Sequence, residues 1–417
     1  MPMRKIILCD TRKIAPFNEP ARELRVVNKP LWLYQRDALA PYCSMEFEVS
    51  SLSQAPADNQ ETLVYRDNLY FDRAFIDAFV SEARASGRAR QVAFAPDDLA
   101  IVHHALPLQS GIRRQGDVYV ADMWYYPHGV ADSAEPLVIS TEAKEIGYYH
   151  VPTYMANESG EMVYYVPLRP FLSIESWVHV FMANSPFGIF SWGARMERDV
   201  ENWRVKGRVF LRSLLERKQF LSNSLLVRTG KRCQIDPSAI IQGPTYIGDN
   251  VTIGPGVVVG NCIIGNNVNI MQGCQVMLSV VGDGCYLPFR AALFMTTLME
   301  NSMVAQNACL QLCVVGRNSF VGAGCTFTDF NLLPKPIRTM HEGRLQPTGL
   351  TVLGGCVGHN CRVGADFTIY PGRTIESDTI LVRAEKRSVV DKNIGYEESD
   401  HHHLLDGDLY KQMYPRD

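Results

Sequence analysis

The 417-residue sequence lacks any apolar run of the roughly 18 residues that a membrane-spanning helix requires. It also lacks a marked excess of one charge, because 41 Lys and Arg residues stand against 44 Asp and Glu residues. The resulting formal charge of −3 argues against nucleic acid or an anionic membrane surface as the main partner. At the N-terminus, the apolar stretch in MPMRKIILCDTRK is short and charge follows at once. This stretch is therefore interpreted as a buried strand and not as a signal peptide.

No pair of cysteines has the CxxC spacing of a structural zinc site, although the chain has eleven cysteines. Nine of them lie at or after Cys233, and nothing in their pattern suggests a secreted disulfide framework. A free thiol packs as a small hydrophobe, which suits these positions. The cysteine pattern therefore favours a cytoplasmic protein.

A six-residue period organises the sequence between Ile235 and Phe327. Apolar residues recur every six positions, with four steps of five. No helix has this period, and a simple strand alternates every two residues. A short fixed repeat of this kind predicts a parallel β-helix of hexapeptide repeats. The repeating apolar positions are Ile235, Ile241, Ile247, Ile253, Val259, Ile264, Ile270, Val276, Val281, Leu287, Leu293, Leu298, Val304, Leu310, Val315, Val321 and Phe327.

Glycine follows many of these apolar residues, as at Gly248, Gly282 and Gly322. We expect the apolar residue to point into a narrow core and the glycine to let the backbone turn the corner without a Cβ clash. The fifth position of each step should be small, and it holds Cys274, Ala308 and similar residues.

The repeat is interrupted near Thr328 and resumes at Val357. The intervening sequence, DFNLLPKPIRTMHEGRLQPTG, is rich in proline and charge. An insertion in a solenoid often projects and carries binding groups. The alternative is that this insertion packs on a neighbouring subunit for stability, and the sequence leaves both interpretations open.

The remaining sequence divides into three parts with different patterns. Residues 1–172 show strand and helix patterns typical of an α/β domain with a mostly parallel sheet. Residues 173–232 have helical periodicity, and Trp177, Trp192 and Trp203 are predicted to lie in an interface core. The β-helix is placed at 233–383, with an inserted loop at 329–350, and a polar C-terminal tail follows at 384–417.

The passage from Arg338 to Ile375, RTMHEGRLQPTGLTVLGGCVGHNCRVGADFTIYPGRTI, has a basic loop and a Gly-x-x-x-x-Thr-Gly turn. A Leu-Gly step and an Ile-x-Pro-Gly-Arg ending follow. This passage resembles the bifunctional sugar-1-phosphate nucleotidyltransferase/acetyltransferase family, whose members make nucleotide sugars. The resemblance implies a nucleotidyltransferase-like domain, a left-handed β-helix and a homotrimer. The residues that carry it are Gly343, Thr348, Gly349, Leu353, Gly354, Ile369, Pro371, Gly372 and Arg373.

The N-terminal stretch APFNEPARELRVVNKPLWLYQRDAL is similar to a variant of the family's nucleotidyltransferase opening. The family's Gly-rich phosphate loop should follow the first strand, but Cys9 to Ile14 contain no glycine. Four nearby cations could still bind a nucleotide or sugar phosphate through their side chains, namely Arg12, Arg22, Arg25 and Lys29.

The resemblance also implies a carboxylate that holds Mg²⁺ after a central strand, and Asp67 is the best positional match. A lone Asp at a strand end can equally be a turn residue.

In the acetyltransferase half, the resemblance places a His general base after the last rung before the insertion. This chain has Thr328 to Leu333 there, without a histidine. Two replacements are conceivable, His341 in the insertion and His359 in a VGHNC step, because imidazole titrates near neutrality. Either histidine can also be a plain turn or surface residue. Acetyl-CoA or another acyl-CoA would be the donor.

Together these features favour a nucleotide-sugar-related transferase, with nucleotidyl transfer, sugar N-acyl transfer or both. The alternative is a non-catalytic trimer that binds a nucleotide sugar or acts as a scaffold. The missing glycines favour the alternative for the first domain, whereas the intact turn and Pro-Gly-Arg ending favour transfer in the second.

Overall fold

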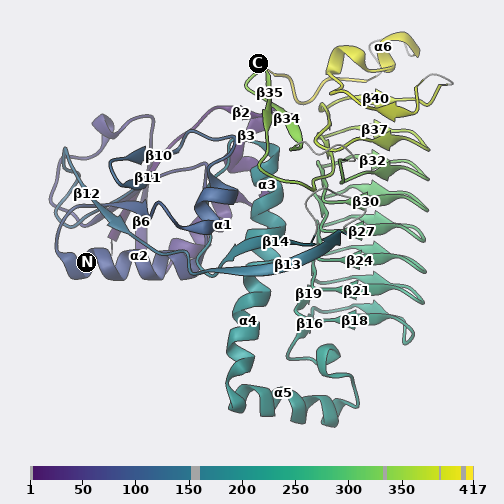
Figure 1. Ribbon diagram of the computed structural model, residues 1–417, viewed down its shortest axis with the longest axis horizontal. Helices are drawn as coiled ribbons and strands as arrows, with labels where there is room; N and C mark the ends of the chain where they lie inside the picture. Colours follow the sequence, from purple (N-terminus) through teal and green to yellow (C-terminus); the bar gives the residue numbers. More distant parts are fainter. Residues whose placement is uncertain (1–2, 152–159, 332–335, 385–386, 405–409, 417) are drawn as a thin grey trace.

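The computed structural model describes residues 3–151, 160–331, 336–384, 387–404 and 410–416. An α/β domain stands beside a parallel β-helix, and a helical segment runs between them (Figure 1). The α/β domain and the left-handed β-helix confirm the predicted fold class. Within the described residues, no helix combines the length and the apolar character needed to cross a membrane.

The β-helix consists of three parallel sheets, each of eight short strands. Each coil contributes one strand to every sheet, so each strand pairs with its equivalent in the next coil. The first sheet contains β16 (Val227–Thr229), β19 (Thr245–Ile247), β22 (Ile263–Ile264), β25 (Val280–Val281), β28 (Thr297–Leu298), β31 (Val314–Val315), β36 (Cys356–Val357) and β39 (Thr374–Ile375). The second contains β17 (Gln234–Ile235), β20 (Thr252–Ile253), β23 (Asn269–Ile270), β26 (Tyr286–Leu287), β29 (Met303–Val304), β32 (Phe320–Val321), β37 (Arg362–Val363) and β40 (Ile380–Leu381). The third contains β18 (Ile240–Gln242), β21 (Val258–Gly260), β24 (Gln275–Met277), β27 (Ala292–Phe294), β30 (Cys309–Gln311), β33 (Thr326–Phe327), β38 (Thr368–Ile369) and β41 (Val389–Val390).

The predicted apolar positions form the core of this β-helix. In the first sheet, Ile247 pairs with Ile264 and Ile264 with Val281, and this register continues to Ile375. All of these side chains are buried, whereas Ile235 in the first coil is exposed. The six-residue period therefore identified the core, and only the end coil departs from the pattern.

The glycines that follow the apolar residues have a different role from the one the sequence suggested. Gly248, Gly282 and Gly322 are not in the left-handed region, which the corner residues Asn250 and Asn267 occupy instead. A Cβ at Gly322 would lie 2.4 Å from the backbone of Gly364 in the next coil. These glycines therefore allow close stacking of coils, while the residues two positions later, Asn250, Gly284 and Gly324, turn the corner in the left-handed region.

The α/β domain contains a seven-stranded mixed sheet in the order β12-β9-β11-β7-β1-β6, with β10 paired to β11. Strand β11 is antiparallel to its three neighbours, β7, β9 and β10. The other pairs are parallel: β1 with β6, β1 with β7, and β9 with β12. The sheet is thus mostly parallel, as predicted. Its strands are β1 (Met3–Leu8), β6 (Cys43–Val49), β7 (Thr62–Arg66), β9 (Arg90–Phe94), β10 (Ile112–Gln115), β11 (Val118–Tyr126) and β12 (Glu135–Val138).

Two helices belong to this domain, α1 (Leu31–Leu39) and α2 (Arg73–Ser86). The Asp72 carboxylate caps the start of α2, and Gly87 in the left-handed region ends it. Five strand pairs complete the α/β domain and the insertion: β2 (Lys13–Ile14) with β3 (Glu19–Pro20), β4 (Arg25–Val26) with β5 (Lys29–Pro30), β8 (Leu69–Phe71) with β15 (Phe171–Ser173), β13 (Ala143–Val151) with β14 (Gly160–Pro167), and β34 (Arg338–His341) with β35 (Arg344–Pro347).

The helical segment contains α3 (Trp177–Asn184), a π-helical turn (Ser185–Phe190), α4 (Ser191–Glu201) and α5 (Trp203–Glu216). Trp177 is fully buried, in agreement with the predicted interface core. Trp203 is 76% exposed, which contradicts that prediction. Helical periodicity reveals an apolar face but does not tell whether anything covers it. The short helix α6 (His401–Leu404) lies in the tail.

One hydrophobic cluster, separate from the inner core of the β-helix, crosses the boundary between the β-helix and the α/β domain. Met295, Met299 and Leu312 of the β-helix belong to the same buried cluster as the residues around α2 and α3. The insertion joins this cluster through Ile337 and Leu350. Its hairpin, β34–β35, packs back on the chain's own α3, where the Trp177 indole donates to Thr339 Oγ1 at 2.9 Å. The sequence had left two interpretations of the insertion open, projection from the β-helix or packing on a neighbouring subunit. This contact within the chain is neither.

Close coil stacking can be tested with Gly322→Ala. The added Cβ would meet backbone atoms that cannot rotate away, so we expect the free energy of unfolding to fall by about 1–3 kcal/mol. Urea unfolding would measure the change. Gly207→Ala on α5 is the control, since a Cβ there meets nothing within 4 Å and should stabilise the helix by up to about 1 kcal/mol. Equal effects of the two substitutions would contradict the stacking role.

Candidate functional site

The first group of predicted site residues lies where β1, β6 and β7 end, at the carboxyl edge of the parallel strands. Asp10 follows β1 and Asp67 follows β7, and the Asp10 N–H donates to Asp67 Oδ1 at 2.8 Å. Ligands of open α/β sheets bind at this edge. Two of the four predicted phosphate ligands, Arg12 and Arg22, contact these carboxylates.

Arg12 is engaged by two carboxylates at this edge. It contacts Asp10 at 2.6 Å and Glu175 Oε2 at 3.0 Å. Glu175 also accepts hydrogen bonds from the Ser110 and Gly111 backbone N–H groups and from the Ser173 hydroxyl. Burial alone would raise the pKa of Glu175, but these hydrogen bonds and the Arg12 charge lower it to about 2. A carboxylate of the chain therefore occupies a cradle that would suit an external anion.

The other three cations are paired in the same way. Arg22 contacts Glu48 at 2.7 Å and Asp67 at 3.3 Å. Arg25 contacts Glu300 of the β-helix and Lys29 contacts Asp37, each at 2.5 Å. None of the four predicted phosphate ligands is thus without a carboxylate partner.

Asp67 was the predicted Mg²⁺ ligand. Its two oxygens accept from the Asp10 N–H and from Arg22, so a guanidinium occupies the position that a divalent cation would need. In the described parts of the chain, no three His, Cys, Asp or Glu side chains are grouped to hold a metal ion. This arrangement does not fit Mg²⁺ unless Arg22 moves away. Burial raises the pKa of Asp67 to about 6.

His359, the first candidate base, lies in the contact between the two domains. Its Nδ1 accepts the Arg317 N–H at 2.8 Å, so the ring proton lies on Nε2, which faces Glu19 at 3.0 Å. Phe17 and Tyr414 pack on the ring, with centroids 5.0 and 4.8 Å away. Burial lowers the pKa of His359, and the ring has no exposed surface. Both nitrogens are committed, so this histidine holds the interface together in the observed arrangement.

His341, the second candidate base, ends β34 beside a two-residue turn formed by Glu342 and Gly343. It is half-buried and faces the protein. Gly343 is in the left-handed region that such a turn requires. The Thr348 hydroxyl donates to the Ile337 carbonyl at 3.0 Å and closes the base of the hairpin. The Gly-x-x-x-x-Thr-Gly pattern therefore shapes the insertion.

Asp329 is a candidate that sequence analysis missed. It follows β33, at the position where the family resemblance places the catalytic histidine. Its Oδ2 is buried and, among the described residues, has no hydrogen-bond partner. Burial raises the pKa of its carboxyl group. The available signal was a carboxylate in the slot of the missing histidine, which the search for imidazole passed over.

Backbone hydrogen bonds gather three segments around Asp329. The Leu353 N–H donates to the Asp329 carbonyl, and the Gly372 N–H donates to the Gly354 carbonyl, both at 2.8 Å. Arg373 follows, and its Nε is a second buried atom with no partner in the described residues. Asp329 Oδ2 and Arg373 Nε are thus two buried polar atoms without a described partner, and such atoms are costly unless a ligand or partner engages them. We name the residues Asp329, Leu353, Gly354, Gly372 and Arg373 the insertion corner.

The hairpin beside the insertion corner carries cations of a different kind from those of the α/β domain. Arg338 and Arg344 are exposed. Neither guanidinium has a described carboxylate within ion-pair distance. In this they differ from Arg12, Arg22, Arg25 and Lys29, which are all paired. Free guanidinium groups can bind phosphate in two-pronged fashion. The hairpin arginines are therefore better suited to bind a phosphate than the paired cations at the sheet edge.

Comparison with known protein families gives a match for one part of the chain. Residues 227–261 match the family described as bacterial transferase hexapeptide (six repeats). No curated protein matches the chain. Among solved structures, a candidate acetyltransferase from Bacillus cereus is similar at 14% identity, covering 30% of this chain and 84% of that one with a TM-score of 0.17. At these values the likeness says nothing about activity. Residues 227–261, the first coils of the β-helix, are therefore similar to the hexapeptide repeats of that family.

The raised pKa of Asp67 predicts a pH-dependent stability difference. Asp67→Asn keeps the oxygen that accepts the Asp10 N–H but removes the ionisation. The folded pKa of about 6 exceeds the ordinary value of 3.8, so the wild type loses stability as pH rises through this window. Relative to wild type, the variant should gain about 2 kcal/mol between pH 4 and pH 7. Urea unfolding across this range measures the difference, and a constant difference would contradict the burial of an ionisable carboxyl.

Proposed function

We propose that the protein is an acyltransferase whose acceptor is the sugar of a nucleotide sugar or sugar phosphate, with the insertion corner as its site. The observation that carries this proposal is the buried Asp329 Oδ2, which has no hydrogen-bond partner among the described residues and lies in the stretch where the family resemblance puts a general base. The match of residues 227–261 to bacterial transferase repeats supports the reaction class.

Asp329 would act as the general base. An amine or hydroxyl of the acceptor transfers its proton to the carboxylate as it bonds to the acyl carbon, and the carbon–sulfur bond of an acyl-CoA thioester breaks to release the thiol. A raised carboxyl pKa makes Asp329 a better proton acceptor than an exposed Asp. Arg373 Nε can donate a hydrogen bond to substrate, and Arg338 and Arg344 can bind its phosphates.

The α/β domain has a non-catalytic role in this proposal. Its cations are neutralised by Asp10, Glu175, Glu48, Asp67, Glu300 and Asp37, and the family's glycine loop is missing. These pairings favour a second candidate function for this domain, the binding or buttressing of a partner without turnover. Nucleotidyl transfer with Mg²⁺ stays a prediction that requires the Arg12 and Arg22 pairs to open.

A homotrimer would complete the site. Met340 and Leu345 pair across the hairpin and are exposed on its outer face. Exposed apolar residues on an ordered hairpin are suited to contact with another copy of the chain. Light scattering should give a trimer for the wild type, and Met340→Glu with Leu345→Glu should give a monomer. A wild-type monomer would count against the assembly.

The role of Asp329 is tested with Asp329→Asn. Acyl transfer from acetyl-CoA to an amino-sugar nucleotide would be followed by mass spectrometry, because the chain's free cysteines react with thiol reagents. We expect a loss of about 100-fold or more in turnover, together with a higher melting temperature, since burial of the charged carboxylate disfavours folding. Loss of activity combined with gain of stability separates a catalytic role from a structural one.

His341→Gln is the matched comparison, because His341 is the competing base candidate in the same insertion. It should retain turnover. If it loses activity while Asp329→Asn retains it, the base is His341 and the assignment of Asp329 is wrong. If neither nucleotide sugars nor acetyl-CoA, with or without Mg²⁺, raise the melting temperature of the wild type, the non-catalytic alternative is favoured.

A further inference from the structure

Helix α5 lies across the end of the molecule where the β-helix begins (Figure 1). Its inner side is held in place. Val209 and Ser213 are buried, and the Ser213 hydroxyl accepts a hydrogen bond from Asn223 at 3.0 Å. The Asn202 side chain caps the first turn by accepting the Arg204 N–H. The opposite side of α5 must therefore face solvent in the single chain.

This outer face is apolar. Residues at helical spacing lie along it, and their side chains are 56–79% exposed. An ordered helix that presents so many large apolar side chains together is typical of a docking surface. The residues are Trp203, Phe210, Leu211, Leu214 and Leu215, with Gly207 at the centre of the face.

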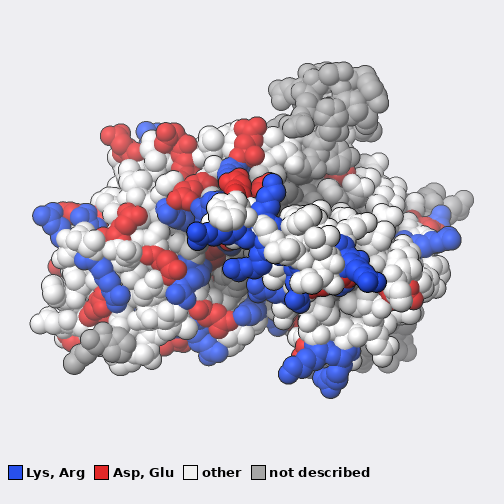
Figure 2. Space-filling model, turned by 90° about the horizontal axis from the view of Figure 1, so that it is seen from below, with Lys and Arg blue, Asp and Glu red and all other residues white. Residues whose placement is uncertain are grey.

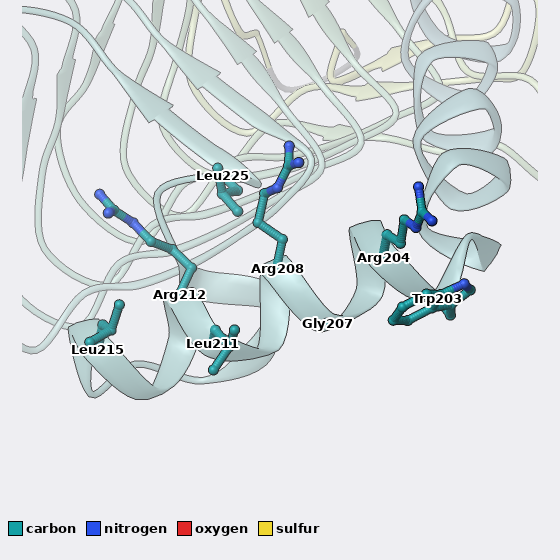
Figure 3. A pocket seen from close by; sticks show the side chains of 8 residues that line it. All are labelled: Trp203, Arg204, Gly207, Arg208, Leu211, Arg212, Leu215 and Leu225. Atoms are coloured by element: carbon teal, nitrogen blue, oxygen red, sulfur yellow. The ribbon is translucent and has the colours of Figure 1, made fainter.

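A basic row borders the apolar face. Arg204, Arg208 and Arg212 follow one another at four-residue spacing and, with Trp203, Leu211 and Leu225, line an open groove of about 690 Å³. Figure 3 shows the three arginine side chains extending upward in the view, whereas Trp203 and Leu211 lie lower. The groove thus offers apolar and cationic groups to the same ligand.

Most of these cations have no internal partner. Residues 203–218 include six basic residues and one acidic residue, in a chain of formal charge −3. Arg212 and Lys218 share Glu216, and no described carboxylate is within ion-pair distance of Arg208 or Lys206. Figure 2, which views the molecule from this end, shows basic side chains gathered over the surface. The net charge of the whole chain conceals this local excess.

We propose that α5 docks the protein onto a bilayer surface of anionic phospholipid. The apolar face would enter the boundary between headgroups and acyl chains, and the basic row would contact lipid phosphates. A second copy of α5 is a poorer occupant, because its cations would oppose those of the first. Nucleic acid would leave Leu211, Leu214 and Leu215 exposed. The prediction that an anionic membrane is not a partner rested on an average over the whole chain.

Vesicle flotation of the full-length protein tests this proposal. Wild type should bind vesicles of phosphatidylcholine mixed with phosphatidylglycerol about tenfold or more better than vesicles of phosphatidylcholine alone, and salt should weaken the binding. Gly207→Glu and Gly207→Lys are the matched variants, since a side chain at Gly207 meets nothing within 4 Å and both should fold. Gly207→Glu should lower binding about tenfold or more, because it places a carboxylate in the lipid-facing surface, whereas Gly207→Lys should keep it.

Equal binding to neutral and anionic vesicles, no binding to either, or equal binding by the two variants would each overturn the proposal. If Gly207→Glu instead changes the oligomeric state measured by light scattering while vesicles do not bind, α5 is an interface between copies of this chain. Melting temperatures of both variants that are no lower than that of the wild type show that a lost interaction is not a lost fold.

Discussion

The placement of the two domains depends on a buried ionic contact made by one carboxylate. Glu19, in the N-terminal segment, faces His359 and Arg317 of the β-helix; His359 is fully buried, and the side chains of Glu19 and Arg317 are only 12% and 13% exposed. Burial would raise the pKa of Glu19, but His359 and Arg317 lower it, so the carboxylate stays charged. Removing one member of such a group would leave an uncompensated buried charge, which is strongly destabilising. The hydrophobic cluster around Met295 and Met299 extends the buried surface between the two domains beyond this ionic contact.

This contact also explains how the α/β domain differs from a nucleotide-binding enzyme. The N-terminal segment that carries the predicted phosphate ligands is fixed to the β-helix through Glu19 and Arg25. At the sheet edge, Glu175 occupies the cradle of backbone N–H groups and Arg12. Internal carboxylates thus satisfy the groups that would otherwise seek a phosphate. The chemistry we propose lies at the insertion corner, on the other side of the interface.

Features with a period or a fixed local geometry could be predicted from the sequence. The six-residue spacing identified Ile247, Val281 and their equivalents as core. Features that depend on contacts between distant residues could not. Nothing in the sequence shows that Glu19, 340 positions away, meets His359, or that Arg12 meets Glu175. Trp203 was misplaced for the same reason, since its spacing fits a covered face and an uncovered one equally well. Asp329 was missed because its residue type differs from the expected base, although its position matched.

The ends of the β-helix have a consequence for how the protein behaves at high concentration. A stack of coils presents unpaired strand edges at both ends, which can recruit further strands and grow into fibres. At the upper end, the tail pairs with β40: the Asp400 N–H donates to the Ile380 carbonyl, and Ser399 and Asp400 side chains accept from Ile380 and Val382. At the lower end, the Gly243 N–H donates to the Leu221 carbonyl of the short 3₁₀ turn Phe220–Ser222. These contacts cover parts of the strand edges at both ends of the stack, and so they oppose the addition of further strands from another copy.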